Sequence, residues 1–354
     1  MGHRFYFLTA LLASWLAANT SLQAGEACCS ASCDPSCQAS NLLPANCDNP
    51  CCADACEASC AAESCCACDA CCDECCGPLW TFRAGAIFLQ RTNPNGPPIA
   101  AATASGAPLL VPDNFNFDTG TGYDLYARRR LASGRSIELR YFEVDDISAA
   151  ATVANAGLLN IGGVTVGGAS GIQASYGSLL RSAEANLVGG ADRWWNPIIG
   201  FRYIGFEDDL RNGFTAGGPV LLSYNVQTEN RLYGGQLGLE GILYSGDRFT
   251  VDMWAKAGVY YNDVDRTTGF FPPVGAPIFP SAASDEVASF VGDVALNTSY
   301  RLTDHIALRG GYQLLWLTDV AEASNQGAAF AGSALNTDGH PFYHGATVGV
   351  EVTW

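Results

Sequence analysis

The chain has 354 residues and is strongly acidic, with 35 Asp and Glu against 18 Lys and Arg and a formal net charge of -17. This charge argues against a nucleic-acid partner, because proteins bind nucleic acid largely through basic side chains on phosphates. Hydrophobic residues make up 48% of the chain. No stretch after the amino-terminal region, however, approaches the roughly 20 apolar residues of a membrane-spanning helix without charge or glycine.

Residues 1–24 have the pattern of a secretory signal peptide. Arg4 supplies a positive charge, the stretch from Phe5 to Ala18 is almost wholly apolar, and the small residue Ala24 ends a short cleavage-site segment. The apolar run is too short to cross a membrane as a helix. We therefore expect an exported protein with no helical anchor.

Residues 25–79 form a region with its own composition. All sixteen cysteines fall between Cys28 and Cys76, and the region contains no aromatic residue and no Lys, Arg or His. With so little apolar bulk it cannot build a core, so any order must come from cross-links or from metal. We expect an acidic, Cys-rich periplasmic extension.

An internal repeat organises this extension, because two sets of four cysteines have the same spacing at an offset of 23 residues. They are Cys28, Cys29, Cys33, Cys37, Cys51, Cys52, Cys56 and Cys60. Export to an oxidising compartment favours disulfides. Adjacent cysteines pair poorly with each other, which favours links to neighbouring copies or to other envelope proteins. A zinc or copper thiolate cluster is the alternative, since Cys-x-x-Cys spacing occurs at Cys68 and Cys71, and a reactive redox segment also stays open.

From Trp80 onward, ten segments read as β-strands, with apolar and polar residues alternating along them. In chain order they are 80–91, 122–131, 135–144, 176–188, 194–206, 231–244, 249–261, 287–302, 306–317 and 342–354. Short turns containing Gly, Ser or Asp join alternate pairs of segments, and long connections join the others. Both ends of the region lie on the side of the short turns.

This sorting of connections by length favours an antiparallel up-and-down transmembrane β-barrel over a soluble β-sandwich. Outer-membrane barrels have short periplasmic turns, long outer loops and an even number of strands. We expect an all-β barrel of about ten strands over residues 80–354. One further hairpin within residues 146–172 would raise the number to twelve.

The closing strand carries the clearest two-faced pattern. Trp354, Val352 and Val350 share one apolar face, while the alternate residues, among them Glu351, form a polar face. A strand of this kind, with a terminal aromatic residue, resembles the signal read by the barrel-assembly machinery of the outer membrane. Lipid contact on the apolar face is expected.

Aromatic residues gather near both ends of the strands, as in the two girdles of a membrane barrel. Those near the short turns are Trp80, Phe82, Trp194, Trp195, Tyr244, Phe249, Tyr300 and Trp354. Those near the long connections are Phe88, Tyr141, Phe206, Tyr261, Phe290, Trp316 and Phe342.

Three stretches, 80–91, 116–123 and 136–143, resemble planctomycete outer-membrane barrels and are similar to the wider Legionella-type pore-forming major outer-membrane proteins. The resemblance covers roughly residues 78–354 and rests on degenerate motifs. It implies a porin-like or structural role in the outer membrane and transfers no catalytic residues.

The polar face of the strands predicts what fills the lumen. Its charged residues are Asp124, Arg128, Glu138, Arg140, Arg202, Glu240, Asp252, Lys256, Asp293, Arg301, Arg309 and Glu351. Six acids meet six bases, and a ten-stranded barrel is only slightly wider than an eight-stranded one whose side chains fill it. We expect a cross-barrel ion-pair network and little permeation by large solutes. Arg181 and Glu184 do not fit one face without a bulge.

An enzyme is a further alternative, because ten-stranded outer-membrane proteases place carboxylates and a histidine at their outer rim. Asp263, Asp265, Asp338 and His340 resemble that pattern, and such groups can activate water. Acidic pairs are common in solvated loops, so no catalytic, metal or cofactor site is predicted in the barrel. The expectation is a structural or weakly pore-forming outer-membrane barrel, with a barrel-anchored metal-sequestering protein and, behind it, a protease as the alternatives.

Overall fold

The computed structural model describes residues 78–354 except 104, 132, 162–163, 190–194 and 327–334. The described part forms one compact unit, Pro78–Trp354. The expected signal peptide and Cys-rich extension, with all sixteen cysteines, lie outside the described residues, as does Trp194.

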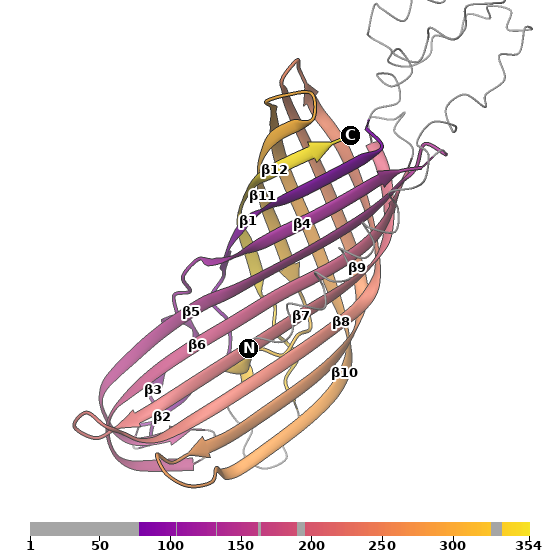
Figure 1. Ribbon diagram of the computed structural model, residues 1–354. Helices are drawn as coiled ribbons and strands as arrows, with labels where there is room; N and C mark the ends of the chain where they lie inside the picture. The colour runs from indigo at the N-terminus through magenta and orange to yellow at the C-terminus, as the bar shows by residue number, and fades with distance from the viewer. Residues whose placement is uncertain (1–77, 104, 132, 162–163, 190–194, 327–334) are drawn as a thin grey trace, which may run out of the picture. The chain divides into compact units, whose positions relative to one another are not determined.

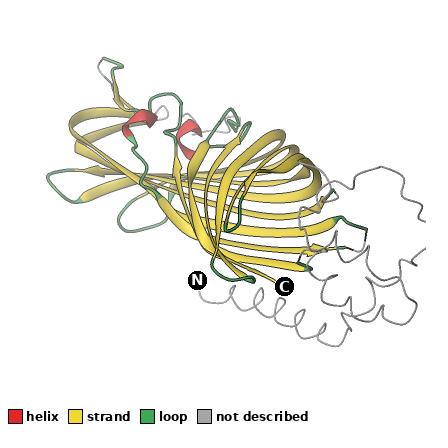
Figure 2. Cartoon of the chain, turned by 90° about the horizontal axis from the view of Figure 1, so that it is seen from above, coloured by secondary structure: helices red, strands yellow, loops and turns green. Residues whose placement is uncertain are grey.

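Ten antiparallel strands close into an up-and-down barrel (Figures 1 and 2). They are β1 (Trp80–Arg91), β4 (Gly120–Arg130), β5 (Ser136–Ile161), β6 (Val164–Val188), β7 (Trp195–Thr215), β8 (Val220–Ser245), β9 (Phe249–Phe271), β10 (Ile278–Arg301), β11 (Ile306–Leu317) and β12 (Phe342–Thr353). Each barrel strand pairs with the next along the chain, and β1 pairs with β12 to close the ring. The predicted all-β barrel of ten strands is confirmed.

The alternative of twelve barrel strands is wrong. Residues 146–172 do not form an extra hairpin but continue β5 and β6, which pair with each other as far as Ile161 and Val164. Two further short strands, β2 (Ala100–Ala102) and β3 (Pro108–Leu110), belong to the first connection, where β2 pairs with the end of β5.

The strands fall into two length classes. β1, β4, β11 and β12 have 11 or 12 residues each, whereas β5 to β10 have 21 to 26. Figure 1 shows the six long strands continuing past the ends of the four short ones. Much of what the sequence suggested to be long loops is therefore a sheet that extends the barrel on one side.

A bulge in β5 sets which side chains of its outer half point inward. The pairing with β6 shifts between Val144 and Ile147, where Asp146 has a φ of 57°. Such a bulge moves the alternation by one residue. Even-numbered residues face the lumen before it, and Ile147 and Ala149 are buried after it.

Two connections fold back against the inner face of the extended sheet. One is the described part of residues 92–119, with the 3-10 helix η2 (Pro112–Asn114), and the other is the described part of residues 318–341, with the 3-10 helix η3 (Ala323–Gln326). Figure 2 shows both short helices, in red, at the end away from the short turns. The buried apolar cluster joins these connections to the strands.

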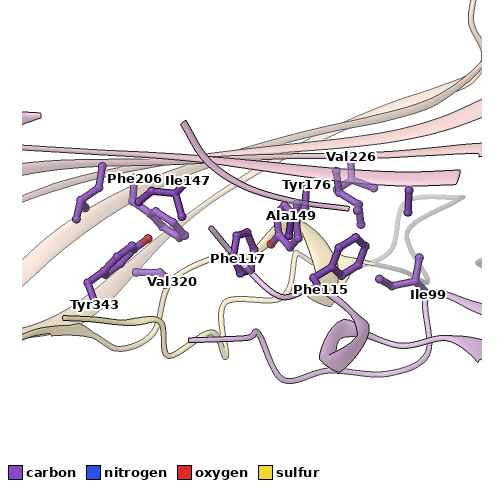
Figure 3. Close-up of a cluster of buried hydrophobic side chains, with 14 of the residues drawn as sticks. Ile99, Phe115, Phe117, Ile147, Ala149, Tyr176, Phe206, Val226, Val320 and Tyr343 are labelled. Carbon is purple, nitrogen blue, oxygen red and sulfur yellow. The ribbon is translucent and has the colours of Figure 1, made fainter. Parts of the chain in front are cut away.

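Figure 3 shows this cluster at close range. Phe115 and Phe117 from the first connection lie against Tyr176 of β6, with ring centroids 5.4 and 5.1 Å apart. Val320 from the second connection and Tyr343 of β12 lie near Phe206 on the opposite side of the view. Burial of these side chains holds both connections inside the barrel mouth.

No helix among the described residues is long and apolar enough to cross a membrane.

Candidate functional site: the lumen and its boundaries

A row of tyrosines crosses the outer surface of the barrel. The registers of β5 to β9 align Tyr141, Ala183, Tyr203, Tyr233 and Tyr261 on one rung. The rings of Tyr203 and Tyr233 are 5.1 Å apart, and Tyr261 is 51% exposed. Tyrosines of membrane barrels gather at the lipid–water boundary. This row therefore marks one edge of the apolar band.

Charged side chains follow directly beyond the tyrosine row. Arg231 on β8 forms ion pairs with Glu229 at 2.7 Å, Asp263 at 3.2 Å and Asp265 at 3.0 Å. Arg181 on β6 is paired with Glu207 on β7. Charge on the lipid face of a barrel is costly at membrane depth. These outward pairs therefore place the surface beyond the tyrosines in water.

The distance between the two girdles fits a bilayer. On β8, Tyr233 and Tyr244 lie eleven residues apart. A strand rises about 3.3 Å per residue, so this segment is about 36 Å long and spans about 28 Å along the axis at a tilt of about 40°. The apolar band of outer-membrane barrels is about 25 Å tall.

The girdle near the short turns includes the seam between β1 and β12. Trp80 and Trp354 exchange backbone hydrogen bonds of 2.8 and 3.1 Å. The Trp354 ring stacks on Phe82 at 4.9 Å, and Phe82 stacks on Trp80 at 5.5 Å. Val352 and Val350 lie on the same outward face of β12, and Val350 is 43% exposed. The terminal aromatic residue thus fastens the closing pair of strands.

Inside, the middle of the lumen is filled by a buried ion-pair network. Glu184 of β6 accepts a hydrogen bond from Lys256 at 2.5 Å and lies 3.8 Å from Arg202. Arg202 also reaches Asp293 across the barrel at 2.8 Å. All four side chains are at most 3% exposed. The attraction among these groups offsets the cost of removing them from water only while the partners stay in place.

Arg140 links this network to the opposite wall. Its guanidinium donates two hydrogen bonds to Asp124, at 3.0 and 2.8 Å, and a third to Gln313 at 2.8 Å. Gln313 in turn donates to Asp293 at 2.8 Å. Nearby, Glu138 accepts a hydrogen bond from the Tyr126 hydroxyl at 2.9 Å.

A second layer of pairs lies towards the short turns. Arg83 is 2.5 Å from Glu351, and Arg309 lies 2.6 Å from Asp252 and 3.6 Å from Glu351. Arg128 forms an ion pair with Glu240 across the lumen. These side chains are 12% to 25% exposed, so water reaches this layer more easily than the middle one.

The structure brings eleven of the twelve predicted lumen residues together on the inner face. They are Asp124, Arg128, Glu138, Arg140, Arg202, Glu240, Asp252, Lys256, Asp293, Arg309 and Glu351. Arg301 is not among these eleven residues. It is exposed at the last residue of β10, next to a short turn, and makes no ion pair within the described part of the chain.

The sequence interpretation missed Arg83 and Glu184. From the sequence, Arg181 and Glu184 do not fit one face without a bulge. The structure places them on opposite faces of a β6 segment that pairs with β7 without a register shift, with Glu184 in the lumen. With both included, the described residues of the membrane-depth lumen comprise six bases and seven acids. They are Arg83, Arg128, Arg140, Arg202, Lys256 and Arg309, against Asp124, Glu138, Glu184, Glu240, Asp252, Asp293 and Glu351.

A third group of charges, here called the Arg91 cluster, consists of Arg91, Asp208, Glu322 and Tyr176. Arg91 donates to Asp208 at 2.6 Å and to Glu322 at 2.5 Å, and the Tyr176 hydroxyl donates to Asp208 at 2.6 Å. The ion-paired side chains are at most 2% exposed. Burial raises the pKa of Glu322, and the nearby Arg91 guanidinium opposes that shift.

The Arg91 cluster fastens the second inward connection to the barrel wall. Glu322 belongs to this connection, whereas Arg91 ends β1 and Asp208 lies on β7. The next two backbone N–H groups, of Ala323 and Ser324, point to Asp208 and to the Tyr176 hydroxyl, each at 3.4 Å. This second inward connection, here called the plug, is thus tied to β1 and β7 on the side of the ion-pair network that lies away from the short turns.

Two open hollows on the described part of the chain lie outside this filled lumen. One of about 360 Å³ is lined by residues of β9 and β10, including Tyr261 and Glu286, and one of about 270 Å³ by residues of β6, β7 and β8, including Ser175 and Arg211. Neither is lined by the charged residues of the membrane-depth lumen.

The protease-like residues do not gather into one site. Asp263 and Asp265 are held by Arg231 on the outer face of β9. Asp338 and His340 lie on the second inward connection and are exposed. Within the described ranges, no group of three or more His, Cys, Asp or Glu side chains is arranged to hold a metal ion.

Phe206 also departs from its expected place. The sequence predicts it in the girdle near the long connections, but its side chain is fully buried inside the barrel mouth. Arg91 lies over its ring at 5.1 Å. The aromatic residue of β7 that faces outward in this region is Tyr203.

No known protein-family model matches the chain, and no curated protein sequence matches it. Among solved structures, it is similar to the outer-membrane protease OmpT from Escherichia coli, with a TM-score of 0.44 and 10% identity over 78% of this chain and 96% of that chain. It is also similar to the translocator domain of the autotransporter NalP from Neisseria meningitidis (TM-score 0.37, 11% identity, 78% and 88% covered). A third is the toluene transporter TodX from Pseudomonas putida (TM-score 0.34, 8% identity, 78% and 89% covered). The likeness concerns the barrel fold alone.

Proposed function

We propose that this chain is a structural outer-membrane barrel whose lumen is closed at rest, so that it conducts small ions weakly and does not pass larger solutes. The observation that carries this proposal is the buried network of Glu184, Lys256, Arg202 and Asp293, which crosses the lumen at membrane depth. The Arg91 cluster and the inward connections close the end of the barrel that lies away from the short turns.

The energetics of the network support a closed state. A solute that entered the lumen would have to separate ion pairs at most 3% exposed, each of which leaves a buried charge without its partner. That cost is about 3–5 kcal/mol for one broken pair. Wide aqueous channels appear only in barrels of about 16 strands. The Legionella-type resemblance is compatible with this role if the pore is narrow.

The location is part of the proposal. The tyrosine row, the outward charges beyond it and the aromatic seam at Trp354 are the surface features of a barrel that contacts outer-membrane lipid and is folded by the barrel-assembly machinery. The test is fractionation of cells followed by gel electrophoresis of boiled and unboiled samples. We expect recovery with outer membranes and a mobility that changes on heating. Recovery as a soluble periplasmic protein would refute the proposal.

For the Cys-rich extension we propose a periplasmic position and disulfide links to neighbouring copies or other envelope proteins. The support is the sequence, since the paired cysteines Cys28 and Cys29, and Cys51 and Cys52, cannot easily pair within themselves. We expect multimers that collapse to monomer with reductant, and their loss when residues 25–76 are deleted. Stoichiometric zinc or copper with no disulfides in the purified protein would favour the metal-sequestering alternative.

We propose no catalytic role for the barrel. A water-activating site needs its carboxylates and histidine around one open space. Here Arg231 neutralises Asp263 and Asp265 on the outer surface. His340 instead lies near Glu322 at the inward connection. Peptide hydrolysis by the purified barrel that Asp263→Asn abolishes would overturn this part of the proposal.

A further inference from the structure

The outer half of β10 has a free edge. β10 pairs with β9 along its length, but its ladder with β11 runs only from Val291 to Arg301. Next to it, the Thr318 N–H donates to the Phe290 oxygen at 2.9 Å, and the chain then turns inward. Across the described part of the barrel, the backbone of residues 278–288 has no strand on that side.

The alternation of the strand identifies the unpaired groups. In an antiparallel strand, the N–H and C=O of every second residue point to the same neighbour. Phe290 bonds on the β11 side, and residues 281–300 pair with β9 without a register shift. The residues that direct their backbone groups to the free edge are therefore Ala282, Ser284, Glu286 and Ala288. All four are exposed.

One of these backbone N–H groups, that of Glu286, is bonded to the side chain of the preceding residue. The Glu286 N–H donates to the Asp285 carboxylate at 2.9 Å. Exposed edges of natural sheets are often protected by charge in this way, because a bare row of N–H and C=O groups is a template for another strand. This exposed side-chain bond leaves the edge accessible to a partner strand that replaces it.

The surface beside the edge is acidic. Glu286 lies next to Asp263 in the β9–β10 register, and Asp265 follows one rung further out. Arg231 pairs with the two aspartates, whereas Glu286 forms no ion pair among the described residues. A partner with basic side chains on this face would complete the charge balance.

A hollow of about 360 Å³ lies at the end of the same edge that is nearest the tyrosine row. Its lining residues are Val259, Tyr260, Tyr261, Glu286, Val287 and Ala288. A long basic side chain suits such a lining, because its aliphatic stem packs on apolar atoms while its charged head stays near an acid or over an aromatic ring.

We propose that the β10 edge at residues 281–288 is a docking site for an extended, basic segment of another protein, which adds to the sheet as a further strand and places a Lys or Arg side chain in the hollow at Glu286. Strand addition supplies main-chain hydrogen bonds, and the hollow supplies side-chain preference. A second copy of this chain suits the edge less well, because two acidic edges would face each other and the chain carries a net charge of -17.

The site lies on the aqueous side of the tyrosine row, since Ala288 is paired with Tyr261 and the lower-numbered residues lie beyond it. The proposal is independent of lumen closure, because no residue of the membrane-depth network belongs to the edge.

The test uses the full chain folded in detergent micelles and a fluorescent ten-residue peptide that alternates Lys with Thr, with both ends blocked. Fluorescence anisotropy should show saturable binding. A peptide of the same sequence with methylated backbone nitrogens, and one with Glu in place of Lys, should each bind at least about tenfold more weakly, because they lose main-chain bonds and charge complementarity respectively.

Variants locate the site. Ser284→Pro removes an N–H that faces the free edge and not the β9 ladder, so it should weaken binding about tenfold while the heat-modifiable mobility is kept. Glu286→Gln should weaken binding about threefold or more and reduce its salt dependence. Glu207→Gln is the matched control, because Glu207 is an outward carboxylate paired with Arg181 on β6, away from β10, and this variant should bind as the parent does.

Several results would overturn the proposal. Equal binding of the N-methylated peptide would exclude strand addition even if Ser284→Pro failed to fold. Equal binding of the Glu peptide, or an equal loss in Glu207→Gln and Glu286→Gln, would exclude a basic partner at this edge. A concentration-dependent dimer of the free chain that Ser284→Pro disrupts would assign the edge to a second copy.

Discussion

Replacing Arg91 with Ala should release the plug from the barrel wall. The Arg91 side chain is fully buried and donates to both Asp208 oxygens, at 2.6 and 3.2 Å, and to Glu322 at 2.5 Å. It also donates to the Ser178 hydroxyl at 3.1 Å and lies over the ring of Phe117 at 5.0 Å. No other base forms an ion pair with either carboxylate among the described residues.

The magnitude follows from the charges left behind. Removing one partner of a buried ion pair costs about 3–5 kcal/mol, because the remaining charge stays buried without compensation. Here two carboxylates, Asp208 and Glu322, remain. Arg211→Ala is the matched control, since the Arg211 side chain is 61% exposed and pairs with Asp209 on its own strand. Exposed pairs of this kind contribute about 0–1 kcal/mol.

The loss should depend on pH in a defined direction. Burial already raises the pKa of Glu322 above that of the unfolded chain, and removal of Arg91 raises it further. A carboxyl with a raised folded pKa takes up its proton more readily in the folded state, so it destabilises the fold increasingly as the pH rises. The difference between Arg91→Ala and the parent should therefore shrink as the pH is lowered from about 8 to about 5. Adding Glu322→Gln should recover part of it.

Urea unfolding of the refolded barrel, followed by tryptophan fluorescence at several pH values, measures these differences. Conductance in planar bilayers gives an independent readout, because a freed plug should let the variant pass more current than the parent. A loss in Arg91→Ala no larger than in Arg211→Ala, with no pH dependence, would refute the assignment of the Arg91 cluster as the fastening of the plug.

Three further changes test other parts of the molecule. Glu184→Ala leaves Lys256 and Arg202 without their shared acid and should lower the unfolding free energy by about 3–5 kcal/mol, whereas a urea midpoint equal to the parent's would show that the network is not coupled. Deleting Trp354 removes the Phe82 stack and the Trp80 hydrogen bonds, so the heat-modifiable fraction on unboiled gels should fall, and an unchanged fraction would contradict its role in closing the barrel. Leu237→Arg lies within the apolar band and should cost about 2–4 kcal/mol in lipid, while Leu221→Arg beyond the charged rows should be close to neutral; equal costs would mean that the bilayer is misplaced.

The membrane-depth part of the fold could be predicted from the sequence because alternation and turn composition agree there. β1 and β11 begin and end at the predicted residues, Trp80–Arg91 and Ile306–Leu317. At membrane depth one face meets lipid and the other meets charge, so the period of two is strong. The inward phase of β12 followed for the same reason.

The extended sheet was not predictable in the same way. Beyond the tyrosine row the two faces of β5 to β10 exchange character: side chains such as Phe214 and Val226 are buried on the inner face, whereas Ser175 and Gln227 are exposed on the outer face. The membrane-depth rule of apolar outward and polar inward therefore does not continue into these segments. The β5 bulge at Asp146 also shifts the phase. Both features break the pattern that identifies the strands at membrane depth.

The Arg91 cluster depends on long-range contacts that the sequence does not record. Glu322 lies 231 residues from Arg91 in a connection rich in Ala and Gly, and Asp208 lies 117 residues away. Which of several acids a buried Arg meets is decided by how the connection folds, not by local pattern. The lumen residues were accessible because strand phase alone placed them.

The most direct measurement of lumen closure is the single-channel conductance of the full chain in planar bilayers, recorded beside the Arg91→Ala variant. The closed-lumen account predicts small, weakly selective currents with at most a slight preference for cations, because seven acids and six bases line the membrane-depth lumen, and a higher conductance in the variant. A large and stable open channel in the parent would contradict it.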